Sequence, residues 1–189
     1  MGIQLGIIGY GGMGGFHHRN ASRIEGVQVI GAYDTDPVRV HAAEKNGIKG
    51  FSTLEELLSC DEINTVLVAV PNDKHMELCV EAANAGKHVI CEKPVAMNVR
   101  ELDQMIAAAG RNGKIFTVHQ NRRWDKDFRI VKKILGIPAN WERYTRFNPG
   151  FMAPGALCSA GAEKKKHGGG MLYDWGVHFY RPIDVDAGL

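Results

Sequence analysis

A glycine-rich hexapeptide near the start of the chain has the residue types and spacing that bind the phosphates of a dinucleotide. It reads Gly9-Tyr10-Gly11-Gly12-Met13-Gly14, which is G-x-G-x-x-G. In this pattern the first glycine permits a tight turn, the second lets the backbone approach a pyrophosphate, and the third allows close helix packing. The helix that follows offers N–H groups and a positive dipole end to the phosphates. The alternative is a glycine-rich turn that binds nothing.

An acidic residue extends this pattern. Asp34 follows Gly14 at the spacing of about 20 residues that the motif requires. A carboxylate at this place can accept hydrogen bonds from ribose hydroxyls, and it would repel a 2′-phosphate. The next residues, Thr35 and Asp36, provide no arginine to bind such a phosphate. The sequence therefore predicts NAD as the cofactor and favours it over NADP.

The surrounding sequence predicts the elements that would position this motif. Short apolar runs alternate with helical stretches as far as about residue 120, which is typical of βαβ units on a parallel sheet. We expect an α/β domain with a six-stranded, doubly wound sheet over residues 1–120. The strands that we place lie at 3–8, 27–33, 64–70, 88–91 and 115–119. Helices are expected at 13–24, from Pro37, and at 54–58, 73–85, 99–109 and 125–135.

The composition excludes several classes of protein. With 23 Lys and Arg against 21 Asp and Glu, the formal net charge is +2, which gives no electrostatic support for a nucleic-acid or membrane partner. The N-terminus lacks a cationic signal region, and no apolar run approaches the roughly 20 residues of a membrane span. The four cysteines form no C-x-x-C pair, so we expect free thiols and no metal site. These features predict a cytoplasmic protein.

Three further stretches lie where loops should leave the carboxyl ends of strands, the edge at which open α/β sheets bind ligands. They are Val-Pro-Asn-Asp-Lys-His at 70–75, Cys-Glu-Lys-Pro at 91–94 and Asn-Arg-Arg-Trp at 121–124. A later segment, 168–178, contains Asp-x-Gly-x-His after three glycines. With these elements the chain resembles the Gfo/Idh/MocA family of oxidoreductases, which includes glucose-fructose oxidoreductase and inositol dehydrogenase. The Glu-Lys-Pro and Asp-x-Gly-x-His elements carry the resemblance more specifically than the glycine motif.

The resemblance implies a Rossmann domain at 1–120, a substrate and oligomerisation domain at 121–189, and hydride transfer between nicotinamide and a secondary hydroxyl of a sugar or cyclitol. It makes Lys93 the catalytic lysine, with Asp174 and His178 as its partners. The residue chemistry agrees. An imidazole can accept the hydroxyl proton near neutral pH, and an ammonium can stabilise an alkoxide. We assign His178 as the general acid/base, Lys93 as the polarising and proton-relaying group, and Asp174 as the residue that orients them.

The resemblance also assigns residues to the nicotinamide side of the cofactor cleft. They are Pro71, Asn72, His75 and Glu92, together with Lys93. His75 could instead lie on an ordinary helix surface. His17 and His18, just after the glycine motif, are expected to be positional rather than catalytic.

The chain also departs from the family pattern. Family members are much longer and carry a large, mostly antiparallel second-domain sheet, whereas only about 70 residues follow the first domain here. This predicts a truncated α+β second domain, and segments 137–163 and 180–189 suggest frameshifts. An alternative function is therefore a catalytically inactive dinucleotide-binding fragment. The expected partner is a small sugar or polyol. The full-length family is expected to form homo-oligomers, and no oligomer is assigned to this chain.

Overall fold

The computed structural model describes residues 2–126, 129–130 and 133. By its contacts the chain divides into two units, Met1–His119 and Gln120–Leu189, and the first unit holds the whole sheet described below. Asp174, His178 and the segments 137–163 and 180–189 lie outside the described residues. Most of the helix expected at 125–135 also falls outside them.

Six parallel strands form one sheet in the order β3-β2-β1-β4-β5-β6, which confirms the doubly wound Rossmann fold. The strands are β1 (Ile3–Ile8), β2 (Val27–Tyr33), β3 (Lys49–Phe51), β4 (Thr65–Val68), β5 (His88–Cys91) and β6 (Phe116–Val118). The strand order reverses between β1 and β4, and a crevice at the carboxyl ends of such a pair is where these sheets bind ligands. Strand β3 is the one that the sequence analysis did not place.

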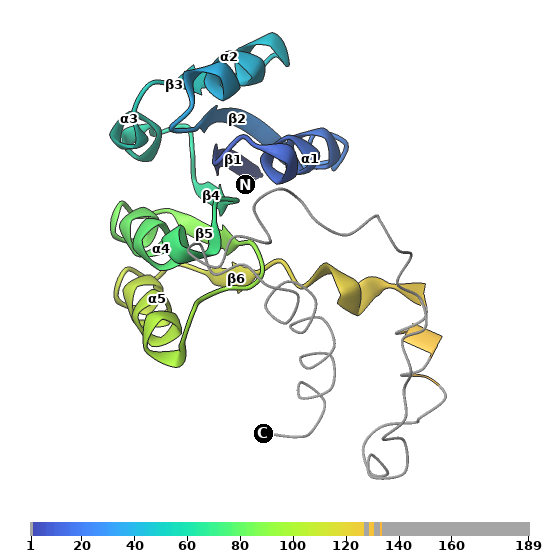
Figure 1. Ribbon diagram of the computed structural model, residues 1–189, viewed down its shortest axis with the longest axis vertical. Coiled ribbons are helices and arrows are strands. Elements are labelled where there is room, and N and C mark those ends of the chain that lie inside the picture. The colour runs from blue at the N-terminus through green and yellow to red at the C-terminus, as the bar shows by residue number, and fades with distance from the viewer. Residues whose placement is uncertain (1, 127–128, 131–132, 134–189) are drawn as a thin grey trace. The chain divides into compact units, whose positions relative to one another are not determined.

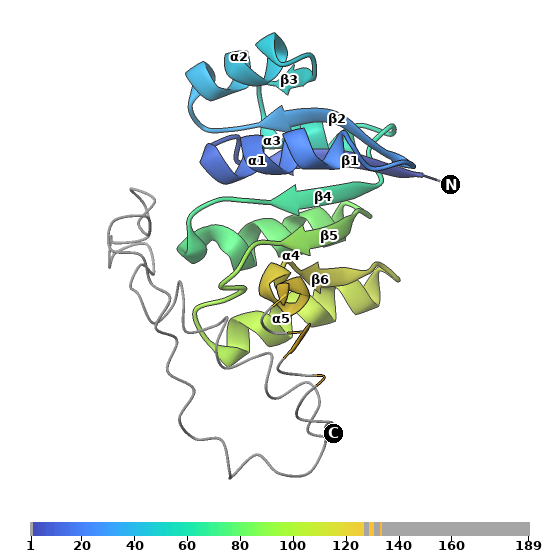
Figure 2. The ribbon, with the colours of Figure 1, turned by 90° about the vertical axis from the view of Figure 1, so that its right-hand side faces the viewer.

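Helices cover both faces of this sheet (Figures 1 and 2). Helices α1 (Gly12–Ala21) and α2 (Pro37–Lys45) lie on one face, and α3 (Leu54–Ser59), α4 (His75–Asn84) and α5 (Val99–Arg111) lie on the other. Two 3₁₀ turns complete the described elements, η1 (Asn72–Lys74) and η2 (Asn121–Trp124). Among the described residues, no helix combines the length and the apolar character that crossing a membrane requires.

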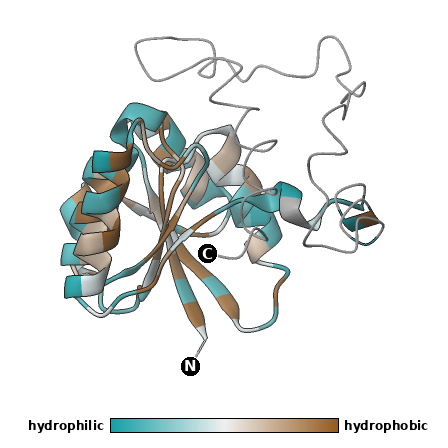
Figure 3. Ribbon diagram, turned by 90° about the horizontal axis from the view of Figure 1, so that it is seen from below, coloured by the Kyte–Doolittle hydropathy of each residue, from teal (hydrophilic) through white to brown (hydrophobic). Residues whose placement is uncertain are grey.

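The core lies in two layers, one on each side of the strands. Ile8, Leu57 and Met105 belong to the layer under α3, α4 and α5, whereas Leu5 and Ile7 belong to the layer under α1 and α2. All four residues of β4 are buried, as expected for a central parallel strand covered on both faces. Figure 3 shows the result, with hydrophobic strands inside and polar residues along the outer sides of the helices.

The boundaries of the helices differ from the predicted ones in ways that have physical reasons. The predicted helix at 73–85 consists of η1 followed by α4, which ends at Asn84, two residues before Gly86 takes a φ of +75°. The helix predicted at 99–109, with Gly110 as its stop, continues to Arg111. Gly113 adopts a φ of +62° instead. A glycine ends a helix only where the chain takes the left-handed conformation.

Candidate functional site

The glycine loop between β1 and α1 is built so that two of its glycines cannot be replaced. Gly9 has a φ of +91°, and a Cβ there would lie 2.5 Å from the carbonyl oxygen of Ala69. A Cβ on Gly14 would lie 2.0 Å from the carbonyl oxygen of Gly9. At Gly12, by contrast, a Cβ would meet none of the described atoms within 4 Å. The loop is therefore closed toward β4 and α1 and open on the side from which a phosphate would approach.

The N-terminus of α1 is also suited to an anion. Its N-cap residue is Gly11, its first turn carries no acidic residue, and no side chain in the described part of the structure caps it. Helices α2, α3 and α5 are each capped by a side chain, those of Asp36, Thr53 and Asn98. The first N–H groups of a helix have no intrahelical partner. At α1 these groups and the helix dipole remain available to a phosphate.

Asp34 lies beside this loop, held by the backbone. Its Oδ2 accepts a hydrogen bond from the Tyr10 amide at 2.8 Å, and its Oδ1 accepts one from the Asp36 amide at 2.9 Å. The residue is only 7% exposed. These bonds fix the carboxylate at the end of β2, next to the glycine loop, where the predicted ribose contact requires it.

An arginine that the sequence analysis missed reaches this carboxylate. The Nη1 atom of Arg39 lies 3.4 Å from Asp34 Oδ2, and its Nε lies 3.7 Å from Asp36 Oδ2. The prediction that no arginine would bind a 2′-phosphate rested only on the residues at positions 35 and 36. Arg39 lies close to Asp34 because α2 begins at Pro37, and the first turn of this helix places residue 39 beside the carboxylate.

The side chain of Tyr10 does not face the ligand side of the loop. It is 6% exposed, and its hydroxyl lies 2.6 Å from His18 Nδ1 and accepts a hydrogen bond from Asn46 at 3.2 Å. Burial lowers the pKa of His18. The backbone of Tyr10 therefore lies at the proposed phosphate site, while its ring packs in the core under α1 and α2.

The other predicted binding segments leave the same edge of the sheet. Ile8 of β1 pairs with Val68 of β4, and Val68 pairs with Cys91 of β5, so the residues that follow these strands emerge side by side. Pro71 is exposed, and Asn72 and Lys93 are partly buried. The placement of Asp174 and His178 relative to this edge stays a prediction, since they lie outside the described residues.

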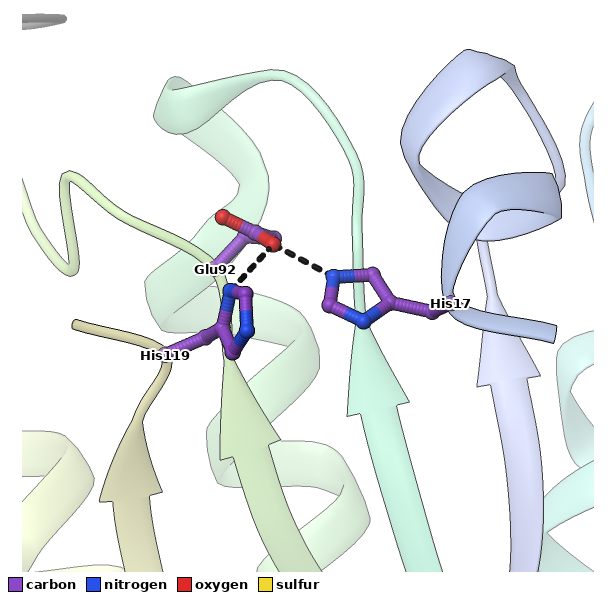
Figure 4. Close-up of side chains that lie close together, drawn as sticks. All are labelled: His17, Glu92 and His119. Atoms are coloured by element: carbon purple, nitrogen blue, oxygen red, sulfur yellow. Dashed lines mark hydrogen bonds and ion pairs between the residues drawn. The ribbon is translucent and has the colours of Figure 1, made fainter. Parts of the chain in front are cut away.

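Glu92, just before Lys93, is a buried carboxylate between two histidines (Figure 4). Its Oε1 lies 2.5 Å from His17 Nε2 and 3.0 Å from His119 Nδ1, and its Oε2 accepts a hydrogen bond from the Lys93 amide at 3.0 Å. Burial alone would raise the pKa of Glu92, but the hydrogen bonds with His119 and His17 lower it well below its ordinary value. Glu92 is therefore ionised.

Three different elements supply this cluster. His17 lies on α1, Glu92 follows β5 and His119 follows β6. Two of these residues extend the hydrogen-bond pattern of the sheet. The Glu92 amide donates to the carbonyl oxygen of Val68 at 3.0 Å, and the His119 amide donates to that of Cys91 at 2.8 Å. Glu92 and His17 were each singled out from the sequence but not paired, because 75 residues separate them, and His119 was not singled out. Their ligand atoms lie within 4.8 Å of one another, so this group could hold a metal ion although the sequence predicted none.

His75 is buried at the start of α4, so the alternative that it lies on an ordinary helix surface is wrong, whereas its assignment to the cofactor cleft stays a prediction. It is 0% exposed, with Nδ1 2.8 Å from the carbonyl oxygen of Pro94 and Nε2 3.0 Å from that of Val70. Burial lowers its pKa, but hydrogen bonds to Cys91 and these carbonyls outweigh burial and raise it. Because a carbonyl only accepts, satisfying both requires a proton on each ring nitrogen. His75 therefore joins the loop after β4 to the loop after β5 through one hydrogen bond to each.

Comparisons with known proteins agree with this arrangement. A family model described as an oxidoreductase family with an NAD-binding Rossmann fold matches residues 3–120. The solved structure of an NAD-binding protein from Listeria innocua is 36% identical, with a TM-score of 0.81, over 97% of this chain and 54% of that one. The scyllo-inositol 2-dehydrogenase (NADP(+)) IolU of Bacillus subtilis is 31% identical over 97% of this chain and 58% of its own.

A third relative was solved with ligands. The WlbA dehydrogenase from Bordetella pertussis, in complex with NADH and UDP-GlcNAcA, is 27% identical, with a TM-score of 0.68, over 71% of this chain and 40% of that one. The chain spans between 31% and 58% of the length of the curated relatives that it matches.

Proposed function

Because the chain belongs to the Gfo/Idh/MocA family of oxidoreductases, we propose that it binds NAD at the β1–α1 loop and serves hydride transfer between the nicotinamide and a secondary hydroxyl of a sugar or cyclitol. One observation carries the proposal. The α1 N-terminus, which no described side chain caps, begins in a loop where Gly9 and Gly14 are sterically required, with Asp34 fixed beside it. The residues present fit a dinucleotide.

The nicotinamide, when bound, accepts or donates the hydride. The chain's own residues bind the cofactor and manage the proton. Lys93, at the carboxyl edge of β5, would place an ammonium beside the reacting hydroxyl and stabilise negative charge on its oxygen. His178 would accept the proton from that hydroxyl, and Asp174, four residues earlier in the sequence, would orient it.

The choice between NAD and NADP depends on two side chains of opposite charge. Asp34 would accept hydrogen bonds from ribose hydroxyls and repel a 2′-phosphate, whereas Arg39 would attract one. The name of the Bacillus subtilis relative includes NADP(+). We propose a preference for NAD, because two backbone amides hold the Asp34 carboxylate in place, while the Arg39 side chain is 53% exposed and mostly solvated.

Titration with NADH and NADPH, followed by nicotinamide fluorescence, tests this preference. We expect NADH to bind at least about tenfold more tightly, a difference of about 1.4 kcal/mol. Asp34→Ala should remove most of that difference, and Arg39→Ala should weaken NADPH alone. Asp61→Ala serves as the control, because Asp61 is exposed and precedes β4 at the opposite edge of the sheet. Tighter binding of NADPH by the wild-type chain would reverse the assignment.

We keep dinucleotide binding without turnover as a second candidate function, because the features described at the site, the α1 N-terminus and the fixed Asp34 carboxylate, concern the dinucleotide alone. Incubation with NAD and a panel of inositols and sugars separates the two functions by the rise in NADH absorbance. Turnover supports the dehydrogenase. Tight NADH binding with no turnover on any member of the panel supports the binding module and rejects the dehydrogenase for this chain.

A further inference from the structure

We propose that His17 and His119 are positioning residues that act on Lys93 through Glu92. The two imidazoles hold the Glu92 carboxylate in one orientation, and the carboxylate holds the backbone amide of Lys93. The proposal rests on the proposed function only where it assigns Lys93 to the reacting end of the cofactor site.

The hydrogen bonds of Glu92 leave it little freedom. Oε1 serves the two imidazoles, at 2.5 Å and 3.0 Å, and Oε2 serves the Lys93 amide at 3.0 Å. The side chain of Glu92 is 7% exposed, so these donors take the place of water around a charge that would otherwise be costly to bury. Rotation of the carboxylate would break bonds on both sides, and Lys93 is therefore held at the β5 edge.

The arrangement also fixes where the protons lie. An ionised carboxylate only accepts hydrogen bonds, so His17 must carry a proton on Nε2 and His119 must carry one on Nδ1. The two rings pack edge to face, with centroids 4.6 Å apart and planes at 78°, so neither ring can turn without disturbing the other. Figure 4 shows both rings directed at the same carboxylate oxygen.

A metal ion would require a different geometry. Two ligands of one tetrahedral zinc ion, each at about 2.0–2.1 Å, stand about 3.3 Å apart. The distances from Glu92 Oε1 to the two imidazole nitrogens, 2.5 Å and 3.0 Å, are those of hydrogen bonds. The observations favour hydrogen bonding, and zinc binding is one of the outcomes to be tested.

The matched variants exploit the shapes of the amide side chains. The donor of a glutamine can replace His17 Nε2, and that of an asparagine can replace His119 Nδ1. His17→Ala and His119→Ala remove the donors, whereas His17→Gln and His119→Asn retain them. His41→Ala is the control, because His41 is an exposed histidine on α2 whose partner, Glu44, lies on the same helix.

Amide hydrogen exchange measured by NMR reports on Lys93 without any cofactor. We expect Glu92→Ala to speed exchange of the Lys93 amide by about tenfold, and the two histidine-to-alanine changes to speed it several-fold. His17→Gln and His119→Asn should restore it to within about twofold of wild type. The amide of Val66, in the buried strand β4, should not change, which separates local loosening from unfolding. His119→Ala, at a half-buried position, keeps the test valid if Glu92→Ala does not fold.

Three results would overturn the proposal: an unchanged Lys93 amide in Glu92→Ala, a parallel rise at Val66 in every variant, or failure of His17→Gln and His119→Asn to rescue. Titration with zinc chloride is the fourth arm. Saturable binding by the wild type that His17→Ala abolishes would make the cluster a metal site instead.

Activity measurements then distinguish the positioning role of the cluster from the proposed dehydrogenase function. If the wild type oxidises a polyol, the histidine-to-alanine variants should lower kcat and leave the KM for NAD unchanged. If it shows no turnover while the Lys93 amide responds as expected, the positioning cluster stands and the proposed dehydrogenase function fails.

Discussion

Lys93 lies between two histidine-containing clusters that are built on opposite principles. On one side, His75 is fully buried and bonds to the backbone carbonyls of Val70 and Pro94. On the other, His17 and His119 are partly exposed and bond to the side chain of Glu92. The first cluster fixes the path of the chain, and the second fixes the orientation of a charged group. Different residues therefore hold the backbone of the loop around Lys93 and orient the charged side chain within it.

The largest effect should come from His75→Ala. The change leaves a cavity and removes the donor from one buried carbonyl, that of Pro94, and one part-buried carbonyl, that of Val70, so we expect a loss of about 3 kcal/mol in the free energy of unfolding. Urea denaturation measures it, with His41→Ala as a control that should stay within about 0.5 kcal/mol of wild type. A loss below about 1 kcal/mol would show that His75 is not a structural tie.

Glu92→Ala should have the next largest effect. It removes the hydrogen bonds that a buried charged group makes with two imidazoles and with the Lys93 amide, for a loss of about 2 kcal/mol by the same denaturation measurement. A loss that exceeds that of His75→Ala would reverse the ranking of the two clusters.

The two clusters should also respond to pH in opposite directions. The pKa of Glu92 is lowered by folding, so its contribution to stability is present above its ordinary pKa of 4.5 and is lost as the pH falls toward the folded value. The pKa of His75 is raised, so its contribution is present below 6.5 and is lost as the pH rises through the folded value.

Denaturation across the range from about pH 3 to about pH 9 checks these signs. Glu92→Gln should flatten the acid side of the stability profile, and His75→Ala should flatten the alkaline side. If both variants flattened the same side of the stability profile, the two clusters would not respond to pH in opposite directions.

The smallest effect expected is that of His119→Ala, because the His119 side chain is 30% exposed, against 13% for His17. Water can replace part of its hydrogen bond, so we expect a loss of about 0.5 kcal/mol, and about 1 kcal/mol for His17→Ala. The paired measurement sharpens the comparison within the cluster, and equal losses would show that exposure does not set the energy of these bonds.

Much of the fold could be predicted because its signals are local. The apolar run at β4 and the proline at the start of α2 each contain their signal within a few residues. Strand β3 could not be placed, since the three residues Lys49–Phe51 are too few to show a period. Gly110 and Gly113 are the same residue type, so residue type alone could not tell that Gly113 takes the left-handed conformation.

The site divides in the same way. Asp34 could be found from its spacing to Gly14, but Arg39 was missed because its approach depends on a helical turn after Pro37. The partners of Glu92 could not be found, since they require β5 and β6 to lie side by side with α1 packed nearby. The burial of His75 could not be predicted, because a polar residue in an amphipathic segment gives no sign that it will bond to two backbone carbonyls.

The separation of these contacts along the chain also sets an order of events during synthesis. The hydrogen bonds of the Asp34 carboxylate join residues 10–39 only, so all of its partners leave the ribosome early. The cluster around Glu92 needs His17 and His119 together, and domains complete their long-range contacts only after the segments involved have emerged. A nascent chain therefore contains every partner of Asp34 well before it contains every partner of Glu92.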